Sequence, residues 1–349
     1  MSTLQVRVAT VEEVLPHPNA DRLKVLTIGG YQTCTAEDYR PGDSVIYVPP
    51  DAVLPDALAE EWGVKSYLTP DNRVKTVKLR GFVSRGFVIR AEGAMVGADM
   101  AEALGITKYE PPEPVGGPDT MFEPQHPAFA TYTEVERLLA YPQAFAEGEE
   151  VIVTEKIHGT NSRVAALLTD GGTRTRFACG TRRRQIKQGV GSKYELPLKM
   201  LAVRDLVDDF MGVFAFPEAV VLFGEIYGPQ VQKRFDYGVI GSNGYAAFDL
   251  ATVCRDEGEG PVFVPYDEFA DWCRRYEVPM APEVYRGPFS LERMAELADG
   301  PSLLGGTHIR EGIVIRPVVE RTDPELGRVI LKRVGDTFEV EEYQWADSH

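Results

Sequence analysis

The chain has 349 residues, 44% of them hydrophobic, and 37 Lys and Arg against 53 Asp and Glu give a formal net charge of −16. This length favours two domains, and the acidic balance excludes a protein that coats nucleic acid indiscriminately through a basic surface. The sequence contains no run of about 18 apolar residues that would predict a membrane span. The first residues lack the apolar stretch of a secretory signal, so we expect a cytoplasmic protein. The four cysteines include no CxxC pair, which predicts neither a zinc site nor a disulfide framework.

Short strands dominate the first 110 residues. We expect them at residues 4–9, 25–28, 44–48, 74–78 and 87–91, and five strands in so short a stretch predict a small β-barrel. The segments His-Pro-Asn-Ala-Asp-Arg-Leu at 17–23 and Leu-Arg-Gly-Phe-Val-Ser-Arg-Gly at 79–86 resemble the tRNA-binding OB domains attached to some synthetases. That resemblance implies contacts to nucleic acid by Lys75, Lys78, Arg80 and Arg85. A barrel that serves only as a packing partner is the alternative.

A proline-rich stretch follows this barrel. Six prolines between residues 111 and 127 interrupt any regular element. We therefore expect an N-terminal domain at 1–110, a linker at 111–127 and a second domain at 128–349.

The second domain is predicted to mix strands and helices. The strands are expected at residues 151–155, 162–168, 220–226, 245–250, 312–318 and 328–334. The helices are expected at residues 132–140, 195–211, 266–276 and 290–298, with Ser290 as the N-cap of the last. Apolar residues at helical spacing, Leu196, Met200, Val203 and Val207, would form the core face of the second helix. This pattern predicts an α+β domain built on antiparallel strands.

The segment Val-Ile-Val-Thr-Glu-Lys-Ile-His-Gly-Thr-Asn at 151–161 places Lys156 between a β-branched run and a glycine turn. An amine attacks phosphorus only after it loses its proton, and burial or a nearby cation favours that loss. Gly159 would let the backbone approach a phosphate closely. An ordinary lysine at a strand end is the alternative, and the KxxG pattern also occurs at Lys78 and Lys332. The flanking sequence favours Lys156 as the nucleophile.

Further segments after Lys156 contain the residue types that a nucleotide and a metal need. An arginine-rich run spans 180–187, and segments with one glutamate each lie at 222–228 and 310–317. An aromatic segment at 245–250 lies between them, and a lysine-containing strand at 329–333 ends the series. Two carboxylates, an aromatic ring and lysines at both ends predict a site for a nucleotide and a metal.

In this order the segments resemble motifs I, Ia, III, IIIa, IV and V of the covalent nucleotidyltransferases, which include polynucleotide ligases and mRNA capping enzymes. The sequence at 155–161 is most similar to the RNA-ligase branch, because DNA ligases usually carry an aspartate where His158 stands. With its OB-type barrel, the whole chain resembles the Deinococcus type of nick-sealing RNA ligase. The resemblance implies an α+β fold in which an antiparallel-sheet nucleotidyltransferase domain, ATP-grasp-like in kind, follows a small OB-type barrel.

The resemblance also implies roles for single residues. Lys156 would attack the α-phosphate of ATP and carry AMP through a P–N bond, while Glu225 and Glu311 would hold Mg²⁺ or Mn²⁺. Phe248 would stack on adenine, with Tyr245 as the alternative, although core packing is an equally ordinary role for Phe248. The implied nucleotide contacts are Glu155, His158, Asn161, Arg182, Glu225, Phe248 and Lys332. The implied RNA contacts of this domain are Arg183, Arg184 and Lys187.

The implied activity is ATP-dependent sealing of 3′-hydroxyl and 5′-phosphate ends, first of all at nicks in RNA-containing duplexes, by a monomer. The alternatives are a DNA ligase or capping guanylyltransferase, and a non-catalytic tRNA- or RNA-binding OB protein. The non-catalytic alternative is favoured by one departure from the family pattern. The last motif usually has two lysines separated by one residue, but here Arg333 and Val334 follow Lys332. Alternation along a strand would direct Arg333 to the opposite face from Lys332.

Overall fold

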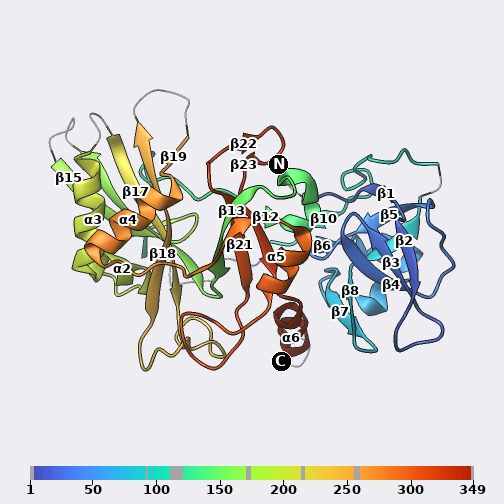
Figure 1. The fold of residues 1–349 in the computed structure, drawn as a ribbon. Helices are drawn as coiled ribbons and strands as arrows, with labels where there is room; N and C mark the ends of the chain where they lie inside the picture. Colours follow the sequence, from blue (N-terminus) through green and yellow to red (C-terminus); the bar gives the residue numbers. More distant parts are fainter. Residues whose placement is uncertain are drawn as a thin grey trace. The chain divides into compact units, whose positions relative to one another are not determined.

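The computed structural model describes residues 4–91, 93–110, 121–169, 174–213, 217–254 and 260–346. The chain divides into two compact units, whose elements Figure 1 labels. Unit 1 contains residues 1–113, 136–145 and 333–349, and unit 2 contains residues 114–135 and 146–332. Two short later segments thus join the N-terminal part of the chain in unit 1. Within the described residues, no helix is both long and apolar enough to cross a membrane.

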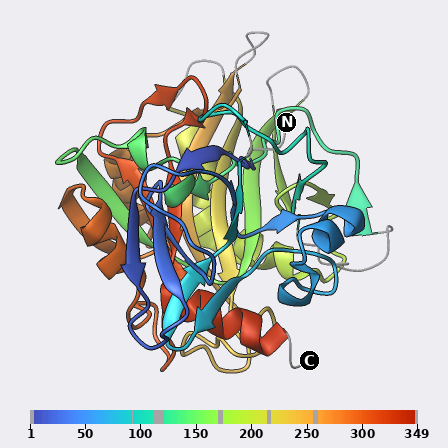
Figure 2. The same cartoon turned by 90° about the vertical axis from the view of Figure 1, so that its right-hand side faces the viewer.

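Unit 1 is built mainly from short antiparallel strands, coloured blue to cyan in Figure 2. One sheet has the order β2-β3-β4, formed by Glu13–Pro16, Lys24–Ile28 and Tyr31–Thr35. A second has the order β1-β5-β9, formed by Val8–Thr10, Ser44–Val48 and Phe87–Arg90. Two smaller pairs join β7 (Thr76–Leu79) to β8 (Phe82–Arg85) and β6 (Ala52–Val53) to β10 (Thr107–Lys108). In β5 the residues 45–48 are all buried, so apolar side chains pack on both faces of this strand, and Leu26 of β3 is also fully buried.

Helical segments complete unit 1. They are α1 (Asp56–Glu61), the short 3₁₀ turns η1 (Lys65–Tyr67), η3 (Leu138–Ala140) and η4 (Pro142–Ala144), and α6 (Asp336–Ala346). α6 contacts β7 and buries Phe338. The helix predicted at 132–140 is wrong, because β12 (Glu136–Arg137) and η3 occupy its second half. Pro142 disfavours α-helical backbone at Tyr141, which limits the segment to a single 3₁₀ turn before the proline.

A seven-stranded antiparallel sheet is the larger part of unit 2. Its order is β11-β16-β15-β14-β17-β18-β19. The strands are Phe122–Glu123, Gln185–Ile186, Arg174–Gly180, Thr160–Thr169, Pro217–Tyr227, Gly244–Cys254 and Val262–Phe263. On one face, α3 (Leu201–Met211) packs against β17 and α4 (Tyr266–Tyr276) against β18. On the other face, a second apolar cluster includes Phe129, Leu167 and Phe223. The β-branched runs therefore form a sheet that is buried on both faces.

A smaller sheet in unit 2 carries the Lys156 segment. After its edge strand β12, its order is β24-β21-β13-β20, formed by Leu331–Val334, Gly312–Pro317, Glu150–Lys156 and Glu283–Pro288. The last two residues of β24 belong to unit 1. α5 (Leu291–Ala298) contacts β21. A hairpin of β22 (Thr322–Asp323) and β23 (Gly327–Arg328) precedes β24.

The predicted strands of unit 2 are confirmed within a few residues, and so are the helices at 266–276 and 290–298. Ser290 caps the latter, because its side chain accepts a hydrogen bond from the Arg293 amide at 3.1 Å. The helix predicted at 195–211 is broken into η5 (Lys193–Glu195), α2 (Leu196–Lys199) and α3. Met200 has extended backbone (ψ 114°) and separates α2 from α3. Val203 and Val207 are buried as predicted, whereas Leu196 and Met200 are only partly buried.

Candidate active site

A pocket of about 210 Å³ opens in unit 2 at the ends of the strands that carry the motifs. All the residues predicted to bind nucleotide or act as nucleophile line it except His158, and the predicted metal residue Glu311 lies beside it. The predicted residues in its wall are Glu155, Lys156, Asn161, Arg182, Glu225, Phe248 and Lys332. The antiparallel sheets thus gather side chains that are up to 177 positions apart in the sequence, from Glu155 to Lys332.

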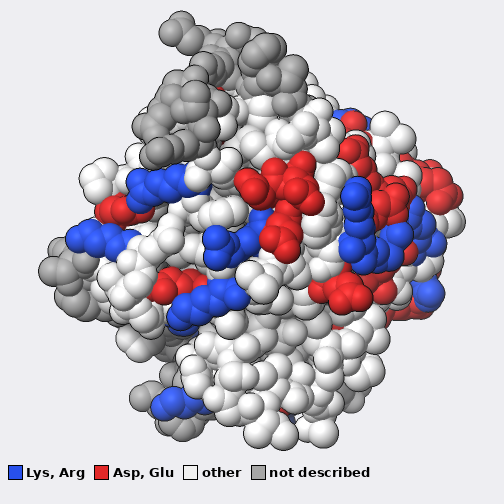
Figure 3. All heavy atoms as spheres, turned by 90° about the vertical axis from the view of Figure 1, so that its left-hand side faces the viewer, with Lys and Arg blue, Asp and Glu red and all other residues white. Residues whose placement is uncertain are grey.

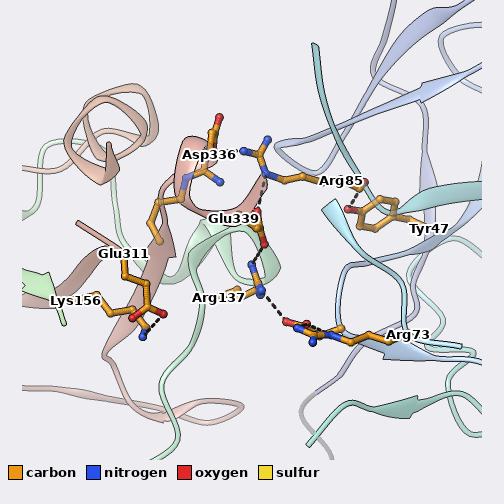
Figure 4. Close-up of polar contacts among 10 residues, drawn as sticks. Tyr47, Arg73, Arg85, Arg137, Lys156, Glu311, Asp336 and Glu339 are labelled. Atoms are coloured by element: carbon orange, nitrogen blue, oxygen red, sulfur yellow. Dashed lines mark hydrogen bonds and ion pairs between the residues drawn. The ribbon is translucent and has the colours of Figure 1, made fainter. Parts of the chain in front are cut away.

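Lys156 is the last residue of β13 and pairs with Gly312 of β21 in the strand register. Glu311 directly precedes Gly312, so the register brings the two side chains together. Lys156 Nζ donates to Glu311 Oε1 at 2.6 Å (Figure 4). The side chains of Lys156 and Glu311 are 26% and 12% exposed. The amine is therefore held in the pocket wall and not in open solvent.

Glu225 and Glu311 have opposite pKa shifts. Burial raises the pKa of Glu225 to about 8, with Lys156 opposing and the charge of Glu311 adding to the rise. Burial also opposes ionisation of Glu311, but the charge of Lys156 and the nearby His158 outweigh it and lower its pKa to about 2. At neutral pH this environment favours a protonated Glu225 next to an ionised Glu311.

Gly159 is required by the packing of the neighbouring strand. A Cβ at this position would lie 2.8 Å from Glu225 Cγ and would collide with the Ile226 carbonyl oxygen. We predicted that this glycine allows close approach to a phosphate. In the structure the close approach is to β17, which brings Glu225 next to the segment that follows Lys156.

Glu155 and His158 flank Lys156 and are held by residues outside the predicted motifs. The Glu155 carboxylate accepts hydrogen bonds from Ser302 Oγ and from the Leu303 amide, both at 2.7 Å. The His158 amide donates to the Tyr237 hydroxyl at 2.7 Å, and His158 Nδ1 lies 3.6 Å from Glu311 Oε2. Sequence reasoning did not find Tyr237 or Ser302, because nothing in their local sequence indicates contact with residues 79 or 147 positions away.

Phe248 contributes an aromatic wall to the pocket, and Tyr132 packs against its ring edge-on at 4.9 Å. The alternative ring, Tyr245, is buried in the cluster on the helix-covered face and does not line the pocket. Behind this wall, the fully buried Asp249 accepts hydrogen bonds from the Tyr132 hydroxyl at 2.7 Å and from Arg328 at 2.6 Å. Arg316 is buried and donates to Asp249 at 3.2 Å. The positive charge of Arg316 therefore pairs with the carboxylate that lies behind the aromatic wall.

Two arginines of the run at 180–187 contact groups of unit 2. Arg182 lies 2.6 Å from Glu134 at the pocket, and the Arg184 guanidinium stacks 3.3 Å from the Phe122 ring centroid. Arg176, which precedes the run, lies 2.8 Å from Glu123. Arg183 and Lys187 are exposed. Figure 3, which views the side of α3 and α4, shows basic and acidic side chains next to one another and no continuous basic surface. RNA contacts by Arg183, Arg184 and Lys187 stay a prediction.

The expectation for Arg85 in unit 1 needs correction. Its side chain is 7% exposed, pairs with Asp336 and lies 3.8 Å from Glu339. A buried guanidinium between two carboxylates does not present charge to an RNA backbone, so we assign Arg85 a structural role. Lys78 and Arg80 are exposed and Lys75 is partly buried. Arg333 is also buried in unit 1 and donates to Asp336 at 3.1 Å, consistent with the predicted alternation.

The carboxylates suit a metal that keeps water and phosphate ligands. Among the described residues, no three His, Cys, Asp or Glu side chains gather as a complete ligand set. Mg²⁺ and similar cations need only one or two carboxylates when phosphate oxygens and water complete the shell. Glu311 fits such a site, because it is ionised and its buried Oε2 accepts no hydrogen bond from the part of the chain that the structure describes. Glu225 lies close enough for its charge interaction with Glu311 to affect its pKa.

Comparison with known families decides the class of this site. A family model described as RNA ligase matches residues 149–334, which is more than half of the chain and includes every motif above. The chain belongs to the RNA ligase family. A second model, an OB-fold domain, matches residues 5–91. These matches confirm the predicted ligase class, with RNA as substrate, and the OB-type barrel ahead of an antiparallel α+β catalytic domain.

Solved structures of an RNA ligase from Naegleria gruberi have the same fold as this RNA ligase family member. A mutant with ATP and Mn superposes with a TM-score of 0.76 at 19% identity, covering 98% of this chain and 100% of that one. A mutant with AMP and Mn gives a TM-score of 0.74 at 20% identity and covers 97% and 98%. The enzyme with PPi gives 0.73 at 20% identity and covers 98% and 99%. No curated protein matches the sequence.

Proposed function

We propose that this chain is an ATP-dependent RNA ligase that works through an AMP group bonded to Lys156, and that it seals nicks in RNA-containing duplexes. The main support is the position of Lys156 Nζ, which lies 2.6 Å from Glu311 in a pocket that Glu225, Phe248 and Lys332 also line. Nucleophile, carboxylates, aromatic ring and a second lysine meet in one cavity of unit 2. The N. gruberi structures with ATP or AMP and Mn support a nucleotide and a divalent cation for a pocket in this fold.

In the first step, deprotonated Lys156 forms a P–N bond to the α-phosphorus of ATP, and the bond to the bridging oxygen breaks so that pyrophosphate leaves with the electron pair. Phe248 would stack on the adenine, Glu225 would bind the ribose hydroxyls, and Lys332 would contact the α-phosphate. Glu311 and Glu225 would hold a divalent cation, which neutralises charge on the phosphates when bound. Pairing with Glu311 orients the amine, and transfer of that carboxylate to a cation would release it.

The remaining steps use RNA ends. A 5′-phosphate oxygen attacks the AMP phosphorus and Lys156 leaves, after which the RNA 3′-hydroxyl attacks the activated 5′-phosphate and AMP leaves. Arg182 at the pocket mouth would receive the 5′-phosphate once it separates from Glu134. Exposed Lys78 and Arg80 on the N-terminal barrel, which we place at residues 1–110 ahead of a linker at 111–127, would contact the duplex.

Covalent labelling tests the proposal. Incubation with ATP labelled at the α-phosphate should leave label on the denatured protein, whereas ATP labelled at the γ-phosphate should leave none. Lys156→Ala should abolish the label, and Lys332→Ala should reduce it without removing the nucleophile. GTP labelling in place of ATP labelling would indicate a guanylyltransferase. Nicked duplexes with RNA or DNA on each side of the break then measure substrate choice, and failure to join any RNA would contradict the proposal.

A further inference from the structure

Two loops outside the sequence motifs hold the residues on either side of Lys156. The loop at 302–308 supplies Ser302 Oγ and the Leu303 amide to the Glu155 carboxylate. The loop at 235–238 supplies the Tyr237 hydroxyl to the His158 amide at 2.7 Å. Both contacts reach the nucleophile segment of unit 2, one before Lys156 and one after it.

The two loops are joined to each other at His308. Its Nε2 accepts a hydrogen bond from the Tyr237 amide at 3.1 Å, and the two rings pack edge to face with centroids 4.4 Å apart. His308 Nδ1 lies 3.0 Å from the Ile309 carbonyl oxygen, so Nδ1 carries the proton and Nε2 is free to accept. The His308 carbonyl accepts from the Ser302 amide at 3.2 Å. A continuous set of contacts therefore runs from Glu155 through Ser302, His308 and Tyr237 to His158.

Tyr237 adopts a backbone conformation that a tyrosine rarely takes. Its φ is 52°, in the left-handed region, and its side chain is buried. Gly305 makes this geometry possible, since a Cβ there would lie 2.9 Å from the Tyr237 carbonyl oxygen. Such backbone strain persists only where surrounding contacts fix it, and it concentrates at functional sites. Here the surrounding contacts fix the Tyr237 hydroxyl, which accepts the hydrogen bond from the His158 amide just after Lys156.

We propose that Tyr237 and His308 are positioning residues that act together as a clamp on the nucleophile segment and hold Lys156 in line for attack on the α-phosphate. Only the expected effect on the rate of lysyl-AMP formation rests on the proposed function; the contacts themselves do not. Neither side chain lines the pocket, so the clamp contacts the Lys156 segment from outside the pocket. A small displacement of a reacting group lowers the rate of a chemical step far more than it lowers substrate binding.

Kinetics of lysyl-AMP formation test the clamp. Tyr237→Phe removes the hydroxyl and keeps the ring, and should lower the maximal rate about tenfold, which corresponds to one hydrogen bond of about 1.4 kcal/mol, with KM for ATP changed less than about twofold. His308→Ala should have a similar effect, and His308→Gln, which restores an acceptor, should recover part of the rate. Tyr276→Phe is the matched control, since its hydroxyl bonds Asp209 on the helix-covered face. A KM increase without a rate loss would overturn the proposal.

Hydrogen exchange gives a readout that does not depend on activity. Amides of residues 155–161 should exchange faster in Tyr237→Phe and His308→Ala than in the wild type, while the peptides of α4 stay unchanged and the far-ultraviolet circular dichroism is retained. Tyr276→Phe should leave residues 155–161 protected. If both clamp variants keep wild-type protection there, the clamp does not exist, whether or not the protein labels with ATP. If protection is lost but wild-type protein does not label, the proposed function fails and the clamp remains.

Discussion

Glu225 and Glu311 are identical side chains in the same pocket, and their surroundings give them different charges. Glu311 is next to Lys156 and is 12% exposed, so its negative charge is paired. Glu225 is partly buried beside that pair, no ion pair among the described residues includes it, and desolvation raises its pKa to about 8 from the usual 4.5. Separation of two carboxyl pKa values in one cavity is characteristic of sites that must hold and release protons. It also makes stability depend on pH.

A raised pKa in the folded state means that the folded protein binds a proton more tightly than the unfolded chain. Ionisation of Glu225 therefore lowers the free energy of unfolding. This loss is absent below pH 4.5, grows between pH 4.5 and 8, and is complete above pH 8. Glu225→Gln removes the ionisable group, so the variant should gain stability relative to the wild type on going from pH 5 to pH 9, by about 4 kcal/mol. Urea unfolding at both pH values measures this difference. The exposed Glu268→Gln should show no such change, and a difference for Glu225→Gln that is constant with pH would contradict the assignment.

At the scale of strands and helices, the sequence predicted the elements that follow from the spacing of neighbouring apolar and β-branched residues. The β-branched residues Val151–Val153 predicted β13, and the register of β13 with β21 then places Lys156 against Glu311. The break at Met200 was not predictable from apolar spacing, because Leu196, Met200, Val203 and Val207 keep helical spacing in the sequence across it. Tyr237, Ser302 and His308 escaped prediction for a different reason, since loops that are distant in sequence bring them to Lys156.

The network around Asp249 joins three elements behind the aromatic wall. Asp249 on β18 pairs with Arg316 on β21 and with Arg328 on β23, and its side chain is fully buried. Asp249→Ala would leave two buried guanidinium groups without this carboxylate, so the free energy of unfolding should fall by about 3–5 kcal/mol. Asp267→Ala removes an ion pair to Arg286 whose side chains are 60% and 35% exposed, and should cost less than about 1 kcal/mol. Urea unfolding of both variants tests the contrast, and equal losses would refute it.

At the scale of the molecule, unit 1 is assembled from segments that are far apart in the chain. Asp51 pairs with Arg73 at 2.6 Å and with Arg137 at 2.7 Å, and Arg137 in turn donates to Glu339 at 2.7 Å (Figure 4). Arg85 pairs with Asp336 on the same helix, α6. The N-terminal barrel therefore uses carboxylates and an arginine that the sequence supplies only after the proline-rich stretch. This dependence could not be read from residues 1–110 alone.

A fragment of residues 1–110 should consequently be much less stable than unit 1 in the full chain. It would lack α6, expose the surface that covers Phe338, and lose the ion pairs of Arg85 with Asp336 and Glu339. Thermal unfolding followed by circular dichroism should show a broad transition or none, and addition of a peptide covering 333–346 should sharpen or raise it. Within the full chain, Glu339→Ala should lower the melting temperature, whereas Glu341→Ala on the exposed face of the same helix should lower it little. A fragment that melts as sharply as the intact protein would show that the charged contacts in unit 1 are dispensable and that the barrel folds from its N-terminal strands alone.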